Sequence, residues 1–195
     1  GVNSQGSNFI GSFAGYQAEN ASYSNYFGQS SGYQAHTSQN SNFIGNQAGY
    51  YAHSAPFSNF LGLNAGFYAH YAENSIFIGA SSGQYAYYAS HSVFMGNGAG
   101  MYAENAEHST LIGYQVGLKT SGNGIGSNNI IIGTNITLPD NTKDSINLGG
   151  IIFATGSYSN LLGNPYTGVA HGKVGINVVT PNHELDVSGS GHFSG

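Results

Sequence analysis

The sequence predicts an all-β fold, a parallel β-solenoid built of 17-residue coils and followed by a C-terminal β-element. Three observations predict it. A short motif, S-x-F-I-G in its commonest form, recurs seven times at a constant spacing of 17 residues. Glycine supplies 31 of the 195 residues, which is about twice its usual share. Charged residues make up only 6% of the chain and aromatic residues 13%, so the chain buries rings with few ion pairs and is not disordered.

The repeat unit is too short and too rich in glycine for helices. The seven copies begin at Ser7, Ser24, Ser41, Ser58, Ser75, Ser92 and Ser109, and we number the unit from this serine as position 1. Glycine stands at positions 5 and 9, where each would cost about 1 kcal/mol in a helix. The S-x-F-I segment predicts a short strand closed by glycine, and the A-G-x-x-A segment predicts a turn and a second short strand. Each unit is then one coil, stacked about 4.8 Å from the next.

Two neighbouring positions of the unit form apolar columns. Position 3 holds Phe9, Tyr26, Phe43, Phe60, Phe77, Phe94 and Leu111, and position 4 holds Ile10, Phe27, Ile44, Leu61, Ile78, Met95 and Ile112. Successive side chains of a strand point to opposite faces, so one column fills the coil and the other faces outward. Monomeric soluble proteins rarely expose such a stripe, so we expect it to be buried against other copies of the chain. Periodicity does not tell which column faces outward, nor the number of copies.

The charge and composition argue against several classes of partner. The chain has three Lys+Arg residues and a net charge of −5, too few cations for a nucleic-acid surface or a polybasic membrane patch. The sequence contains no run of about 18 apolar residues, so it does not predict a segment that inserts into a membrane. The first residues do not form a signal peptide. Cysteine is absent, which excludes disulfides and thiolate metal sites. We expect no cofactor and no metal.

The chain divides into three regions. Residues 1–126 are predicted to form a seven-coil β-solenoid. Residues 127–170 form an irregular transition, in which Ser127 restarts the motif after 18 residues and Ser145 and Ser159 begin weaker echoes. Irregular insertions can hold binding loops, so this region is a candidate fibre tip. Residues 171–195 are predicted to form the C-terminal β-element.

Two polar columns are candidate binding residues. Position 11 holds Tyr51, Tyr68, Tyr85 and Tyr102, and position 13 holds His36, His53 and His70. If this face is exposed, its rings and hydrogen-bonding tips suit a carbohydrate or another surface polymer. The alternative, which we favour, is that identical side chains simply stack along the outside of the solenoid. Neighbouring histidines would lie about 5 Å apart, but chance clustering on a polar face explains them better than a metal site.

Catalysis has little support in the sequence. Glu73 and Glu107 share a phase two coils apart, about 10 Å, which is near the carboxylate separation of inverting glycosidases. No second signal accompanies this pair, and no nucleophile motif such as G-x-S-x-G occurs. We therefore expect that the protein is not an enzyme.

Parts of the sequence resemble known fibre proteins. The I-G-x-x-A core resembles the head repeats of trimeric autotransporter adhesins, whose usual unit is shorter. The F-I-G-x-x-A-G-Y form is closer to repeats of bacteriophage tail fibres and related bacterial surface fibres, including trimeric adhesins of predatory bacteria. The C-terminal motif comprises Val174, Gly175, Ile176, Pro181, Leu185, Asp186, Val187 and Gly189. It resembles a motif that precedes the endosialidase-type intramolecular chaperone of tail fibres, although Asn177 replaces a common glycine.

These resemblances imply a homotrimeric, extracellular fibre segment of a virion tail fibre or a bacterial cell surface. Its expected function is structural and adhesive, with faces presented to a cell-surface glycan or polymer receptor. One alternative is a purely structural spacer. A polysaccharide-degrading tailspike is a less favoured alternative.

Overall fold

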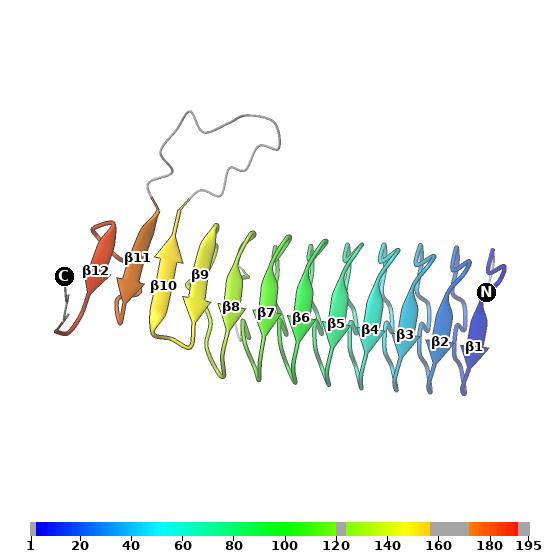
Figure 1. The fold of residues 1–195 in the computed structure, drawn as a ribbon. Coiled ribbons are helices and arrows are strands. Elements are labelled where there is room, and N and C mark those ends of the chain that lie inside the picture. The colour runs from blue at the N-terminus through cyan, green and yellow to red at the C-terminus, as the bar shows by residue number, and fades with distance from the viewer. Residues whose placement is uncertain (1–2, 120–123, 157–171, 191–195) are drawn as a thin grey trace, which may run out of the picture.

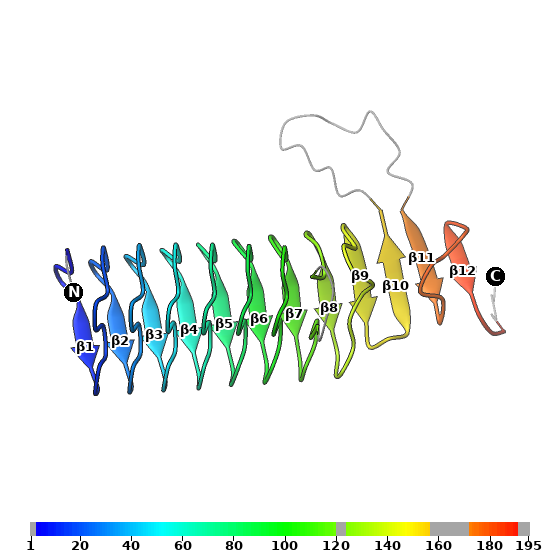
Figure 2. The ribbon, with the colours of Figure 1, turned by 180° about the vertical axis from the view of Figure 1, so that it is seen from behind.

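The computed structural model describes residues 3–119, 124–156 and 172–190, and it confirms the β-solenoid. Twelve strands form one sheet in chain order, and the described residues contain no helix. The strands lie side by side along a rod, with the N-terminal strand at one end and the C-terminal strand at the other (Figures 1 and 2). Because each strand pairs with its neighbours in sequence, the rod lengthens by one strand per coil.

The strands of the regular coils occupy positions 2–4 of the unit. They are β1 (Asn8–Ile10), β2 (Asn25–Phe27), β3 (Asn42–Ile44), β4 (Asn59–Leu61), β5 (Ile76–Ile78), β6 (Val93–Met95) and β7 (Thr110–Ile112), and β8 (Ile130–Ile132) follows them in an eighth coil. Neighbouring strands pair in parallel, with equal positions opposite one another, as for Phe43 and Phe60. The unit therefore sets the pairing register, and the glycine at position 5 ends each strand.

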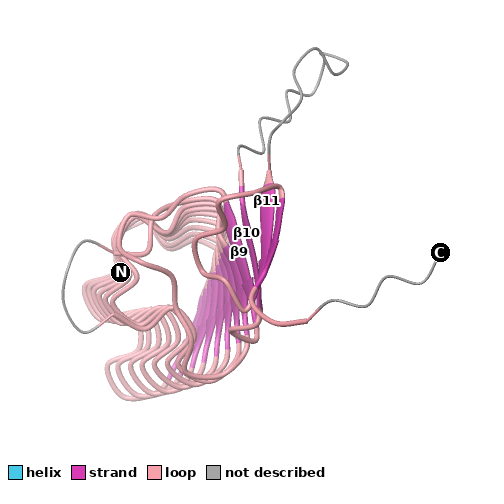
Figure 3. Cartoon of the chain, turned by 90° about the vertical axis from the view of Figure 1, so that its left-hand side faces the viewer, coloured by secondary structure: helices cyan, strands magenta, loops and turns pink. Residues whose placement is uncertain are grey.

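The prediction of a second short strand in each coil is wrong. The remaining positions form turns, with a single parallel bridge at position 13 between neighbouring coils, from Glu19 to Tyr87. The backbone conformation prevents a second strand, because positions 7, 9, 11, 14 and 17 have left-handed φ values, as at Tyr51 (φ 54) and Ser54 (φ 54). Such residues bend the chain and interrupt an extended strand. Seen along the rod, the sheet forms one side and the turns enclose the interior (Figure 3).

The position 3 column fills the interior of the solenoid. Phe43, Phe60, Phe77 and Phe94 are fully buried. From Phe9 to Phe94 the rings stack in single file, with centroids 4.7–4.9 Å apart and planes within 9° of parallel. Alanines at position 12, such as Ala52 and Ala69, are also fully buried and pack around the rings. A 17-residue coil therefore encloses one large ring and a few small side chains.

Tyr26 is the exception in the ring column, and it has a matching partner. Its hydroxyl lies 2.5 Å from the hydroxyl of Ser38, which stands at position 15 where most other coils have alanine. Burial raises the pKa of Tyr26 to about 12, so its phenol stays neutral. The two substitutions occur in the same coil because each hydroxyl satisfies the other in the dry interior.

A column of buried serines at position 1 closes each coil and joins it to the next. The Ser58 hydroxyl donates to the carbonyl of Ala72 in its own coil (2.6 Å). It also accepts a hydrogen bond from the backbone N–H of Ser75 in the following coil (3.1 Å). The same pair of bonds recurs at Ser24, Ser41 and Ser75. This repetition explains why position 1 is always serine in the seven regular units.

The eighth coil begins at Asn129 rather than at Ser127. The Asn129 N–H donates to the Ser109 hydroxyl (3.1 Å), so Asn129 occupies position 1 of a longer, 20-residue spacing. Its side-chain oxygen accepts from the N–H of Ser145, which begins β9 (Ser145–Leu148). Parallel pairing thus continues through β8 and β9, beyond the boundary at residue 126 expected from the sequence.

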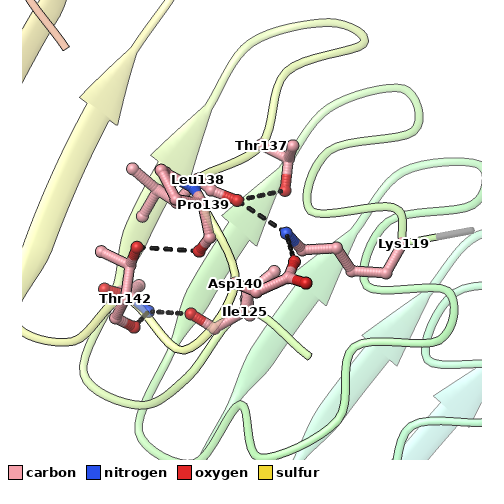
Figure 4. A network of polar contacts seen from close by, with 8 residues as sticks. Lys119, Ile125, Thr137, Leu138, Pro139, Asp140 and Thr142 are labelled. Carbon is pink, nitrogen blue, oxygen red and sulfur yellow. Dashed lines mark hydrogen bonds and ion pairs between the residues drawn. The ribbon is translucent and has the colours of Figure 1, made fainter. Parts of the chain in front are cut away.

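A buried lysine anchors the turn that precedes β9. The Lys119 ammonium donates to the carbonyl of Leu138 (2.7 Å) and forms an ion pair with Asp140 (2.6 Å) (Figure 4). Thr142 closes the same turn by donating its hydroxyl to the carbonyl of Pro139 (2.8 Å). Lys119 stands at position 11, where the four preceding coils have tyrosine, so the tyrosine column ends at this turn.

The C-terminal part changes direction. β10 (Ile152–Thr155) pairs antiparallel with β9 and with β11 (Lys173–Ile176), and β11 pairs in parallel with β12 (Leu185–Val187). These last two strands hold most of the C-terminal motif, and the Asp186 carboxylate accepts from the N–H of Asn182 (3.0 Å). The echo beginning at Ser159 lies outside the described residues.

Candidate binding site

The position 11 tyrosines form a ladder of stacked rings. Centroids are 4.9 Å apart for Tyr51 and Tyr68, 5.7 Å for Tyr68 and Tyr85, and 5.1 Å for Tyr85 and Tyr102. The ring planes are within 24° of parallel. The rungs repeat at the coil spacing, as expected for one residue type at one position of a parallel stack.

A second aromatic ladder at position 10 was not predicted. It consists of Tyr16, Tyr33, Tyr50 and Phe67, with centroids 4.9–5.2 Å apart. It contacts the first ladder edge to face, as where the rings of Tyr50 and Tyr51 lie 4.7 Å apart at 70°. The same 17-residue spacing could have revealed it, because its four members occupy consecutive coils.

Stacking limits what these ladders can bind. A sugar ring packs on the flat face of an aromatic ring, and here each inner ring has its faces covered by the rings above and below it. The hydroxyls and ring edges remain outside. An open aromatic face is therefore available only at the end of a ladder.

The histidines also lie together, in a column between an acid and a tyrosine. Ring centroids are 4.8 Å apart for His36 and His53 and for His53 and His70, and His70 stacks on Tyr87 at 4.7 Å. The Glu19 carboxylate lies 3.3 Å from His36 Nδ1. Nowhere in the described ranges do three His, Asp or Glu side chains form a group that could hold a metal ion.

The histidine column is expected to make stability depend on pH. Burial and, to a smaller extent, the neighbouring histidine lower the pKa values of His53 and His70 below 6.5. The unfolded chain then takes up protons first, so protonation favours unfolding. The free energy of unfolding should be highest above about pH 6.5 and should fall as the pH drops towards the pKa values of the folded state.

Urea titrations across this pH range should show the fall in stability. The doubly substituted His53→Gln, His70→Gln chain should have a flatter profile of stability against pH. An equal slope in both chains would contradict the assignment.

The outward face of the sheet changes character along the rod. At position 2, Asn8, Asn25, Asn42 and Asn59 form a ladder of side-chain amide bonds of 2.7–2.8 Å. From β5 onward this position becomes largely apolar, with Ile76, Val93 and Ile130 beside the position 4 column. Position 4 points outward throughout, and Ile10 is the most exposed of its members at 64%. No charged side chain stands at either position in β1 to β8.

No family model matches the sequence, and no curated protein matches it. Within the part of the chain that the structure describes, no helix has the length and apolar character needed to cross a membrane.

Proposed function

We propose that the chain is a segment of an extracellular, homotrimeric fibre of the tail-fibre or bacterial adhesin type, which binds glycans or other cell-surface polymers. The uninterrupted stack of twelve strands in chain order carries this proposal. Strand pairing, turn hydrogen bonds, the serine column and the ring column all join each coil to the next. A chain so joined is a stiff rod, which is what a fibre that holds a binding surface away from a cell or virion requires.

The outer face of the sheet supports the trimer. It is continuous, uncharged in β1 to β8 and apolar at position 4 in every coil. Such a stripe is rare on monomeric soluble proteins. Three rods packed around one axis would bury it, and the resemblance to trimeric fibre heads supports the number three. Three copies also present three identical sites, so weak contacts to a surface polymer add through effective concentration.

A purely structural spacer is the second candidate. The covered ring faces of the position 11 ladder favour it, because they withdraw most of the ring faces of that ladder from a ligand.

One experiment tests both the assembly and the function. Light scattering should give three times the mass of the chain for the parent and for Thr37→Glu, whose site is exposed and outside the sheet. Ile78→Glu should give the mass of a single chain, because it places a charge on the apolar stripe that the trimer would bury. The trimer should adhere to surfaces coated with bacterial polysaccharide. A parent that is a single chain contradicts the trimer, and a trimer that adheres to no such surface is a spacer.

A further inference from the structure

A short aromatic ladder at position 14 ends in an open ring face. The rings of Tyr71 and Tyr88 stack with centroids 5.0 Å apart and planes only 2° from parallel. The next rung is Asn105, which has no ring to cover Tyr88 on that side. Tyr88 is 47% exposed, and on the side of Asn105 it lines a cleft together with residues of later segments.

A cleft of about 340 Å³ lies at this end of the ladder. It is lined by Tyr88, Asn105, Glu107, Ser127, Asn141 and Lys143. Three segments meet there, because residues 124–129 before β8 fold against the sixth coil, and the turn before β9 folds against residues 124–129. The N–H of Asn128 donates to the carbonyl of Glu107 (2.9 Å), and the N–H of Asn141 donates to the carbonyl of Gly124 (3.1 Å). These backbone bonds fix the polar groups around the ring.

We propose that this cleft binds one neutral pyranose unit of a glycan, an inference that rests on the proposed adhesive function and locates its site. The C–H face of the sugar packs on Tyr88. The amides of Asn105 and Asn141, the hydroxyl of Ser127 and the carboxylate of Glu107 are suited to sugar hydroxyls. The volume is at the small end of ligand sites, which suits a single sugar ring. One carboxylate and one ammonium, from Glu107 and Lys143, balance in charge and favour a neutral sugar over a polyanion.

The decisive variant is Asn105→Tyr, because it adds the missing rung. Asn105 has φ 57, close to the φ values of Tyr88 (55) and Tyr71 (53), so the backbone already accommodates tyrosine at this position. The new ring should cover Tyr88 and leave the fold intact. We expect ligand-observed NMR with methyl glucoside, methyl galactoside, methyl mannoside and N-acetylglucosamine to show binding of at least one sugar to the parent trimer. Asn105→Tyr and Tyr88→Ala should each weaken it at least about tenfold.

The control is Tyr114→Ala, since Tyr114 is similarly exposed (48%) but does not line the cleft. It should bind the sugar as the parent does. Binding by Asn105→Tyr at parental affinity, or no binding of any of the four sugars to the parent, overturns the cleft assignment. If the parent still adheres to polysaccharide in that case, the adhesive function stands and its site lies elsewhere. Sugar binding by a trimer that does not adhere would support the cleft and contradict the adhesive function.

Discussion

Replacing Gly66 by alanine should destabilise the solenoid by about 3–5 kcal/mol, as the sum of steric overlap in the core and left-handed backbone strain. Gly66 stands at position 9 with φ 63, and a Cβ there would overlap the ring of Phe60. That ring cannot move aside along the column, because it stacks between Phe43 (4.8 Å) and Phe77 (4.7 Å). Urea unfolding followed by circular dichroism would measure the loss.

Gly149 provides the matched control for this substitution. It has the same φ of 63, but a Cβ there would meet no atom within 4 Å. Gly149→Ala should therefore cost only the strain of a left-handed alanine, about 1–2 kcal/mol. Equal losses at the two sites would show that the ring column does not require glycine at position 9.

Ser58→Ala should destabilise the chain by about 2–4 kcal/mol, because two buried backbone groups lose their partner. The N–H of Ser75 and the carbonyl of Ala72 both bond to the Ser58 hydroxyl in the interior. Water cannot replace that hydroxyl, because Ser58 and its neighbours in the column are fully buried. The loss should appear as a lower urea midpoint with an unchanged slope.

The exposed Ser12 is the control for the serine column. It stands at position 6, and its side chain makes no hydrogen bond in the described structure. Ser12→Ala should change stability by less than about 0.5 kcal/mol. A Ser58→Ala chain as stable as Ser12→Ala would mean that the column contributes nothing beyond shape.

The period alone predicted the strands and the two apolar columns, but not which column faces inward. The glycine at position 9 and the alanine at position 12 decide this, because the ring of Phe60 fits only where Gly66 has no side chain. The prediction of a second strand failed for a different reason. Residues such as Tyr51 and Phe57 have left-handed φ values, which are uncommon for bulky side chains, so nothing in their identity indicated a turn.

The start of the eighth coil and the candidate site show a further limit. Ser127 matched the motif by residue type, yet Asn129 takes position 1, since its longer amide can bond to several turn carbonyls at once. For the site, the spacing predicted columns of tyrosine and histidine. Only the structure shows that ring faces within a column cover one another, and that Tyr88 meets residues from two later segments.

The single file of rings also constrains how this protein can vary in length. A deletion or duplication of a whole unit keeps the register, so that each ring, glycine and serine still lies next to the same residue type in the neighbouring coil. A change of length between positions 3 and 9 would instead move the glycine away from the place where the ring of its own coil leaves no room for a side chain. Solenoids of this type can therefore be long or short, but only in steps of one coil, about 4.8 Å each.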